Sequence, residues 1–289
     1  MRVTSLGFRT DVALRVLEGA ETTDRGDYLV VRTRDNPDFY WGNFLLLGAW
    51  PEPGSADGWL ARFAAEFPAA RHVALGVDAE SDVPGAGSGG ARGGLSPRGG
   101  RGDGSPREGS SQQSSEEFRA AGLEPERATV LTCAGTDVVP PPRPSTEAEI
   151  RRLESDDDWQ QSLQLAIRCF GDGGSYLSRR AAARRRITRE GRAAWFGAFT
   201  AGRLVAQLGV CDAGQGLVRY QDVETDPAAR RRGLAGTLVW RAGCYAAEAF
   251  AARALVIVAD PAENAIRVYR GCGFADAQSQ FSFERQSAE

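Results

Sequence analysis

The sequence predicts a mixed α/β (α+β) fold, in which helices flank a central, mostly antiparallel sheet, in two tandem copies. One observation is the order of hydrophobic patterns in residues 147–289, which change between the helical period of about 3.6 residues and the strand period of two. They indicate a strand, two helices, three strands, a helix, a strand, a helix and a strand. The other observation is that part of this pattern occurs twice in the chain.

The repeat is visible when residues 63–78, FAAEFPAARHVALGVD, are aligned without gaps with residues 245–260, YAAEAFAARALVIVAD. The two segments are identical at seven of sixteen positions, and both read as the end of a helix, a turn and a strand ending in Asp. A second pair follows, FRAAGLE at 118–124 and YRGCGFA at 269–275. We interpret the repeat as a duplication, to which chance similarity between alanine-rich helices is the alternative.

Two segments of biased composition divide the chain. Residues 81–115 consist mainly of Gly, Ser, Pro and Arg without an aromatic residue, which predicts a disordered insert in the first copy. Residues 138–146, VVPPPRPST, favour extended polyproline II and predict a linker. The predicted organisation is therefore a degenerate N-terminal copy over residues 1–137, the linker, and a complete domain over residues 147–289.

The elements of the second domain can be placed more closely. Ser155 or Asp156 is the predicted cap of a helix that runs to about Phe170. The strands from residue 193 to residue 225 look like an antiparallel meander. In order, we expect a helix at 178–191, strands at 193–200, 204–211 and 217–225, a helix from Gly233 to Phe250, a buried strand at 254–260, a helix at 263–272 and a strand at 279–285.

Composition excludes several classes of protein. The chain of 289 residues is 42% hydrophobic and can bury a core, and its net charge of -3 argues against a general nucleic-acid or membrane-surface binder. No apolar segment is long enough for a signal peptide or a membrane span. Five separated cysteines fit reduced thiols, and His72 alone cannot build a zinc site. We therefore expect a cytoplasmic monomer or homodimer without a metal.

The segment ARRRGLAGTL, residues 229–238, places three arginines at the start of a predicted helix, where the helix dipole disfavours each cation by about 0.3–1 kcal/mol. A solvated charge run is one interpretation. The other is an anion site, because the first N–H groups of a helix are unpaired and glycine or alanine lets a ligand approach them. A pyrophosphate would accept hydrogen bonds from these groups and from the arginines.

Arg230, Gly233 and Ala235 follow a strand and the turn TDP, and their spacing resembles the R/Q-x-x-G-x-G/A motif of the GCN5-related N-acetyltransferases, the GNAT superfamily. The order of elements over residues 147–286 is similar to that family as well. The resemblance implies that this loop holds the pyrophosphate of acetyl-CoA and that the preceding strand binds the pantetheine arm and polarises the thioester carbonyl. The contacts it implies are Val223, Glu224, Thr225, Arg230, Arg231, Arg232, Gly233, Leu234, Ala235, Gly236 and Asn264.

The same resemblance assigns a general acid to Tyr269, which precedes the turn at Gly273. A phenol with a pKa of about 10 can donate its proton to the departing CoA thiolate. A tyrosine that only packs in the core is the alternative. One position departs from the family, since its usual Asn corresponds to Ala262 and Asn264 is displaced by two residues.

Glu224 is our candidate for the base that deprotonates the acceptor amine, acting through a water molecule. Strand alternation places it on the same face as Asp222. A strand residue that faces solvent is the alternative. We expect His72, in the other half, to be structural, and we do not expect a covalent route through Cys272, which has no histidine nearby in the sequence.

Three segments bear on the acceptor. The arginines of residues 179–192 either favour an acidic acceptor or form a solvated helix face. The aromatic segment DFYWGNFLLLG, residues 38–48, either lines an acceptor pocket between the halves or packs in a core. Residues 48–54, GAWPEPG, replace the Arg-Gly loop in the first copy with prolines and a glutamate, so we expect no acetyl-CoA there.

The expected function is direct transfer of an acetyl group from acetyl-CoA to a primary amine of a small-molecule or peptide acceptor. A module that binds or senses acyl-CoA without catalysis is the alternative. RNA binding through the insert is a third possibility, but no aromatic residues stand between its arginines to stack on bases, so no nucleic-acid partner is expected.

Overall fold

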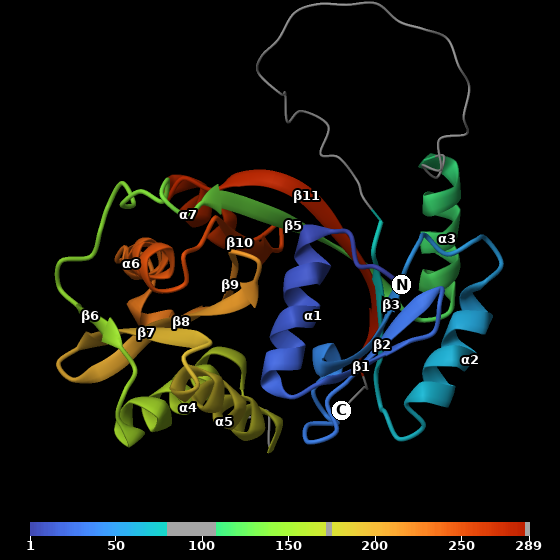
Figure 1. Cartoon of the computed structure of the whole chain (residues 1–289), viewed down its shortest axis with the longest axis horizontal. Coiled ribbons are helices and arrows are strands. Elements are labelled where there is room, and N and C mark those ends of the chain that lie inside the picture. The colour runs from blue at the N-terminus through green and yellow to red at the C-terminus, as the bar shows by residue number, and fades with distance from the viewer. Residues whose placement is uncertain (80–107, 172–174, 287–289) are drawn as a thin grey trace, which may run out of the picture.

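The computed structural model describes residues 1–79, 108–171 and 175–286 (Figure 1). The first half of the chain contributes α1 (Leu6–Glu18), β1 (Glu21–Asp24), β2 (Tyr28–Arg32), the 3-10 helix η1 (Tyr40–Gly42), β3 (Asn43–Leu47), α2 (Ala56–Glu66), β4 (Val73–Val77), α3 (Glu108–Ala120) and β5 (Glu124–Ala134). The second half contributes β6 (Glu149–Arg152), α4 (Asp156–Phe170), α5 (Ser175–Arg189), β7 (Ala193–Thr200), β8 (Arg203–Gly214), β9 (Leu217–Thr225), η2 (Pro227–Ala229), α6 (Leu234–Ala249), β10 (Ala254–Ala259), α7 (Ala265–Gly271) and β11 (Ala275–Arg285).

The strands form one sheet of eleven in the order β1-β2-β3-β4-β11-β5-β10-β9-β8-β7-β6. Neighbours are antiparallel except β3 with β4 and β9 with β10, which are parallel. This mixed, mostly antiparallel sheet flanked by helices is the fold class that the sequence predicts. The order of elements predicted for the second half is also confirmed, including the meander of β7, β8 and β9.

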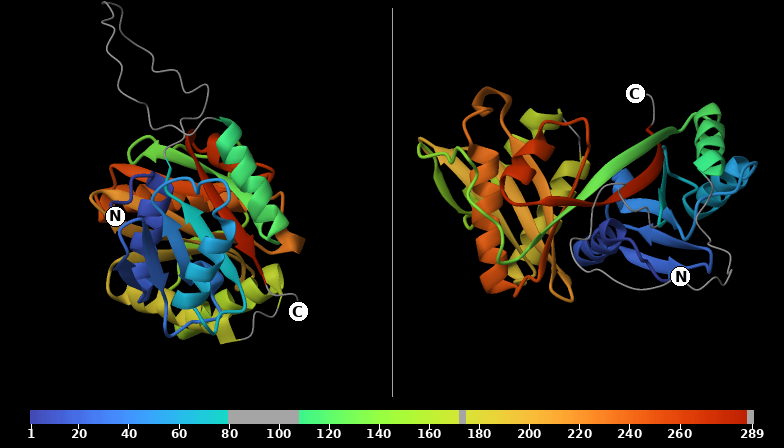
Figure 2. Two further views of the ribbon diagram at one scale, coloured as in Figure 1. Left: turned by 90° about the vertical axis from the view of Figure 1, so that its right-hand side faces the viewer. Right: turned by 90° about the horizontal axis from the view of Figure 1, so that it is seen from above.

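The two halves exchange a strand at the centre of this sheet. β5, from the first half, pairs with β10 of the second half, and β11, the last strand of the chain, pairs with β4 of the first half. The exchanged strands also pair with each other over nearly their whole length. Figure 2 shows β5 and β11 running side by side between the two parts of the molecule. Each half therefore supplies a strand to the other half's part of the sheet.

The aligned segments of the repeat occupy matching elements. Residues 63–78 and 245–260 each contain the end of a helix and the strand that follows, α2 with β4 and α6 with β10. Residues 118–124 and 269–275 each end at the first residue of an exchanged strand, β5 or β11. Parallel pairing of β3 with β4 matches that of β9 with β10. The interpretation of residues 1–137 as a degenerate copy stays a prediction that this correspondence supports.

Helix α3 corrects the prediction for the insert. Residues 108–115 were expected to be disordered with the rest of residues 81–115, but they form the first part of α3. The reason is tertiary packing: the Ser114 hydroxyl donates to the carbonyl oxygen of Pro51, and the Phe118 ring stacks on Phe283 of β11 with 4.2 Å between centroids. The remaining part of the predicted insert lies outside the described residues.

Helices cover both faces of the second half's sheet. Helices α6 and α7 pack on one face around Leu238 and Tyr269, whereas α1, α4 and α5 pack on the other around Trp195 (Figure 1). Helix α1 comes from the first half of the chain, so it adds a second link between the halves. No helix in the part of the chain that the structure describes is both long and apolar enough to cross a bilayer.

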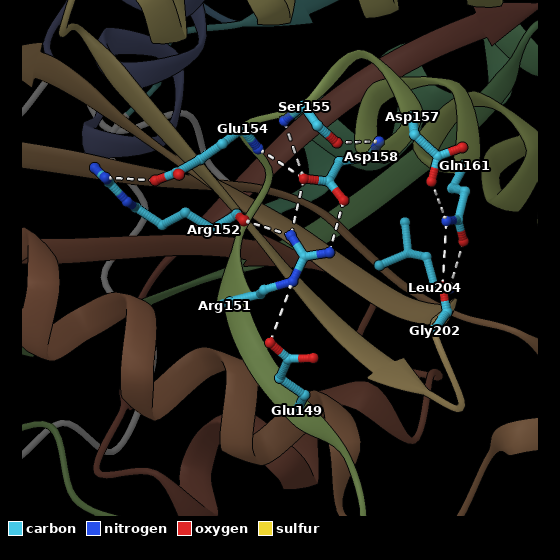
Figure 3. A network of polar contacts seen from close by, with 10 residues as sticks. All are labelled: Glu149, Arg151, Arg152, Glu154, Ser155, Asp157, Asp158, Gln161, Gly202 and Leu204. Carbon is cyan, nitrogen blue, oxygen red and sulfur yellow. Dashed lines mark hydrogen bonds and ion pairs between the residues drawn. The ribbon is translucent and has the colours of Figure 1, made fainter.

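The cap of α4 shows how the sequence fixes one of these helices. The Ser155 side chain accepts from the Asp158 N–H, and the Asp158 carboxylate accepts in return from the Ser155 N–H, forming a capping box (Figure 3). Arg151 on β6 donates two hydrogen bonds to the same carboxylate, at 2.7 and 2.8 Å. The helix spans residues 156–170 as predicted, and its cap ties it to the edge strand.

Candidate active site

The neighbouring strands β9 and β10 separate from each other towards their C-terminal ends. Their parallel pairing joins Leu217–Arg219 to Ala254–Val256, and beyond these residues neither strand pairs with the other. From Tyr220 to Thr225, β9 therefore has an edge that faces β10 without a ladder of hydrogen bonds. Such an edge can bind an extended ligand through backbone groups.

A cavity of about 550 Å³ opens beside this separation. Its walls come from both halves of the chain and from the exchanged strands. They include β9 and the end of β10, helices α1 and α5, the aromatic segment around η1, and β5 and β11. The aromatic segment fits both of its interpretations in part: Phe39, Tyr40 and Trp41 line the cavity, whereas Phe44 packs in a core.

A β-bulge shapes β9 where it borders the cavity. The register with β8 shifts between Gly209–Gln221 and Gln207–Glu224, which leaves one extra residue on β9. Asp222, in this stretch, has a φ of +52°, an uncommon conformation for a residue other than glycine. Its carboxylate is 3.2 Å from Arg180 and 2.5 Å from Arg184, both on α5. These two ion pairs hold the bulge against the helix.

Glu224 lies two residues further along and also lines the cavity. Only 5% of its surface is exposed, and the Gln207 side chain donates to its carboxylate at 2.6 Å. Burial, followed by the nearby negative charge of Asp222, raises the pKa of Glu224 to about 7. A carboxyl group that titrates at this pH can take a proton from an ammonium ion, so the geometry supports the candidate base and excludes the solvent-facing alternative.

The loop between β9 and α6 has the form expected of an anion site. Arg231 and Gly233 adopt left-handed conformations, with φ of +63° and +75°. No side chain caps α6, and the N–H groups of Leu234, Ala235 and Gly236 make no hydrogen bond within the described residues. These donors are available to a ligand.

The three arginines of this loop differ in their contacts. Arg232 forms an ion pair with Glu147 at 2.5 Å, so its charge is already compensated. Arg230 donates a long hydrogen bond from Nε to the Thr225 carbonyl oxygen at 3.4 Å. Neither Arg230 nor Arg231 pairs with a carboxylate of the described residues. These two cations are the ones that can reach an anion.

The predicted linker packs directly against this loop. A Cβ atom at Gly233 would lie 2.2 Å from the carbonyl oxygen of Arg143, and one at Gly236 would lie 2.8 Å from the Pro141 side chain. The Ser145 N–H donates to the Thr237 hydroxyl at 2.8 Å. Both glycines are therefore needed for packing as well as for access to the helix N–H groups.

Tyr269 and Asn264 lie on α7, away from the cavity lining. The Tyr269 ring is 5% exposed and packs in the core with α6, and burial raises its pKa to about 12. Asn264 is exposed at the start of α7, and no side-chain hydrogen bond caps the helix there. The structure thus brings Glu224 into the cavity, whereas Tyr269 is close to the loop helix but does not face the cavity.

Several residues of the cavity were not found from the sequence. Glu284 on β11 accepts from the Trp41 indole at 3.0 Å, although 243 positions separate them in the chain. Arg180, which lines the cavity, and Arg184 behind it belong to the helix for which the sequence leaves open an acidic acceptor or a solvated face. Both pair with Asp222 instead, and Arg184 is 2% exposed. On a helix, positions three or four apart share a face, as Arg180 and Arg184 do on α5. This spacing is the one signal in the sequence that could have indicated that both face the sheet.

The remaining predictions concern residues outside the cavity. His72 is buried, and its Nε2 lies 2.9 Å from the Asn43 carbonyl oxygen, which agrees with a structural role. All five cysteines are free, and burial raises the pKa of Cys272 to about 11, which disfavours a covalent route. The loop at residues 48–54 joins β3 to α2, the position that the Arg-Gly loop has between β9 and α6.

The separated parallel strands, the bulged strand and the open helix N-terminus all lie within residues 159–274, which match the model of the acetyltransferase (GNAT) family. These residues run from α4 to the turn after α7, so the match includes β9, the Arg-Gly loop, α6 and β10. Among curated protein sequences, none is significantly similar to the chain.

Solved structures with this fold match nearly the whole chain. A GCN5-related N-acetyltransferase from Kribbella flavida has a TM-score of 0.62 at 14% identity, covering 98% of both chains. Another from Sphaerobacter thermophilus has a TM-score of 0.58 at 17% identity, covering 96% of this chain and 85% of that one. A tandem GNAT protein from the clavulanic acid biosynthesis pathway has a TM-score of 0.54 at 11% identity, covering 100% and 90%. The likeness shows a shared fold.

Proposed function

We propose that the protein is an N-acetyltransferase that moves an acetyl group from acetyl-CoA directly to a primary amine of a small-molecule or peptide acceptor. One observation carries the proposal: the edge of β9 is open where β9 and β10 separate, and it lies beside the buried Glu224 carboxyl. An acyl donor on this edge and an amine in the cavity would meet at Glu224.

The loop residues fit acetyl-CoA. The N–H groups of Leu234, Ala235 and Gly236 and the guanidinium groups of Arg230 and Arg231 would hold the pyrophosphate. The backbone of Val223, Glu224 and Thr225 would bind the pantetheine arm. Gly233 gives the chain the left-handed turn that aims the N–H groups outward.

The proposed reaction needs two proton transfers by this chain. Glu224 accepts a proton from the acceptor ammonium, directly or through water, and the free amine attacks the thioester carbonyl. The C–N bond forms and the C–S bond breaks. The CoA thiolate takes up a proton from the Tyr269 hydroxyl, and the second proton that the nitrogen loses returns to Tyr269 through water. The raised pKa of Tyr269 keeps this hydroxyl protonated at neutral pH, as a general acid must be.

A module that binds acyl-CoA without transferring the acyl group is the second candidate. The observation that favours it is the position of Tyr269, which is buried and does not line the cavity. In that case the loop and the edge of β9 would bind the cofactor, and no acceptor would be consumed.

A turnover screen separates the two functions. Acetyl-CoA binding is measured by calorimetry, and release of free thiol is measured with amines, amino acids, aminoglycosides and peptide N-termini as acceptors. Thiol release that depends on an acceptor supports the transferase. Saturable binding without release supports the sensing module, and the absence of binding contradicts both.

A further inference from the structure

The charges around the cavity are unequal. Two carboxylates and two guanidinium groups of the lining neutralise each other: Asp11 is 2.8 Å from Arg219, and Asp222 pairs with Arg180 and with Arg184 behind it. Arg15 pairs with Glu18 at 2.5 Å. Four further lining carboxylates form no ion pair within the described residues: Glu126, Glu224, Asp260 and Glu284.

The remaining guanidinium of the lining does not compensate them. Arg127 on β5 donates to the Ser279 hydroxyl at 2.8 and 3.1 Å, and its guanidinium lies 5.8 Å from the centre of the Phe281 ring. Phe281 packs with the core under α2 and α3. Since side chains alternate along a strand, Glu126 lies on the opposite face of β5 from Arg127. The cavity therefore carries an excess of negative charge.

Three of these four carboxylates lie at two places, whereas Asp260 is exposed just after β10. One is Glu224 on β9. The other is formed by the exchanged strands, where Glu126 on β5 is the register partner of Ser282, and Glu284 lies two residues beyond on β11. Glu284 accepts from Ser282 and from the Trp41 indole. β9 and β11 are three strand spacings apart, on the order of 14 Å, so one ammonium group cannot contact both places.

Aromatic rings border the second place. The guanidinium of Arg180 covers Phe39 at 4.4 Å, but no guanidinium of the described residues lies over Tyr40 or Trp41, which are also in the lining. An ammonium group beside Glu284 would thus find a carboxylate and the half-buried rings of Tyr40 and Trp41 nearby, a combination that favours organic cations.

We propose that the acceptor is a linear amine with at least two ammonium groups, held at one end by Glu284, Glu126 and Trp41 while its other end meets Glu224. The inference rests on the proposed function and names its substrate class. It assigns specificity to strands that the two halves exchange, because Glu126 and Glu284 come from β5 and β11.

Spermidine and butylamine test the inference, since butylamine has only one amine. Calorimetry without acetyl-CoA should show spermidine binding, weakened about tenfold in Glu284→Gln and in Glu126→Gln. Glutamine keeps an acceptor for Trp41, and the Glu126 side chain forms no ion pair with the residues that the structure describes. Glu248→Gln, on the exposed side of α6, is the matched control and should bind spermidine as the native chain does.

In the thiol-release assay, the same two variants should raise the KM for spermidine about tenfold, with kcat and the KM for butylamine nearly unchanged. An unchanged KM for spermidine in both variants, or equal kcat/KM for the two amines in the native chain, overturns the inference while the transferase stands. If no amine is acetylated but the variants still weaken spermidine binding, the proposed function fails and the cation site remains.

Discussion

Glu224 is the side chain whose protonation the proposed chemistry depends on. Its pKa of about 7 lies where a general base is most useful, because the carboxylate form is then present at neutral pH and still binds a proton. The cause is burial next to Asp222, a neighbour that keeps its own charge through Arg180 and Arg184.

We predict that kcat/KM rises with pH through about 7, since Glu224 must lose its proton to act as base. Glu224→Gln should lower kcat/KM by about 10²- to 10⁴-fold and remove this rise. Steady-state assays across the pH range measure both effects, with Glu248→Gln as the control. A rise of the same size in Glu224→Gln would assign the titration to another group.

A substitution of Tyr269 can distinguish a catalytic role of this residue from a role in core packing. If it protonates the thiolate, Tyr269→Phe should lower kcat by about 10²-fold or more while thermal unfolding changes little, because the ring still fills its place in the core. Tyr245→Phe on α6 is the control, since that hydroxyl accepts a long hydrogen bond from Arg152, at 3.3 Å, on the protein surface. Native-like kcat in Tyr269→Phe would remove this residue from the mechanism.

Individual residues also show what could be read from the sequence. Glu224 was predicted because alternation along one strand is a local property. The charges that shift its pKa could not be predicted, since Arg180 and Asp222 are 42 positions apart and meet only when α5 packs on the sheet. The bond between Trp41 and Glu284 depends on the strand exchange and has no local signal at all.

At the scale of elements, the turn into α6 requires a glycine at position 233 for two reasons, its left-handed backbone conformation and its close contact with the linker. Gly233 has a φ of +75°, and a Cβ atom there would meet the Arg143 carbonyl oxygen. We predict that Gly233→Ala weakens acetyl-CoA binding more than Arg230→Ala, Arg231→Ala or Arg232→Ala does. Calorimetry gives the four affinities, and a larger loss in any arginine variant would mean that charge outweighs loop geometry.

Gly191→Ala is the control for backbone strain in that comparison. Gly191 has a similar φ of +72°, but nothing lies within 4 Å of its missing Cβ. A loss of stability common to both glycine variants measures the left-handed turn. Any additional loss in Gly233→Ala measures the contact with the linker.

The cap of α4 yields a prediction about stability. Arg151 beside Asp158 holds the pKa of that carboxyl well below its usual range. Asp158→Ala should lower the free energy of unfolding by about 2 kcal/mol at neutral pH, since it removes the cap and leaves Arg151 with its longer ion pair to Glu149, at 3.4 Å. Asp157→Ala, with one exposed bond to Gln161, should change it by less than about 0.5 kcal/mol.

Acid conditions check the cause of that effect. A carboxyl with a lowered pKa contributes stability above its unfolded-state pKa, and the contribution is lost as pH falls through the folded-state pKa. Urea unfolding of the native chain and Asp158→Ala should therefore give converging free energies as the solution is acidified. A difference that stays constant would contradict the charge-based explanation.

At the scale of the whole molecule, the strand exchange makes the halves interdependent. Sequence patterns identified β10 and much of β11 as strands, because periodicity reveals the type of an element. Which strands pair across the halves is decided by long-range packing, and the exchange was not predicted. The predicted division into residues 1–137 and 147–289 separates the two halves along the sequence. In the fold, both halves contribute strands to one sheet.

We predict that the two halves unfold together. Unfolding either half would leave β5 or β11 without one neighbour, so a state with only one half folded is unfavourable. Hydrogen exchange in urea should give similar opening free energies for β2–β3 and for β7–β8. Two clearly separate values would show that each half folds by itself.

The exchange also decides what a cut in the chain would do. The segment between β5 and β6 is the covalent connection, but the pieces on either side of it remain interleaved, each holding a strand that the other needs. Cleavage there would yield complementing fragments that stay associated. In such an architecture, the peptide link ensures that one copy of each half is present, and the hydrogen bonds between strands hold the two halves together.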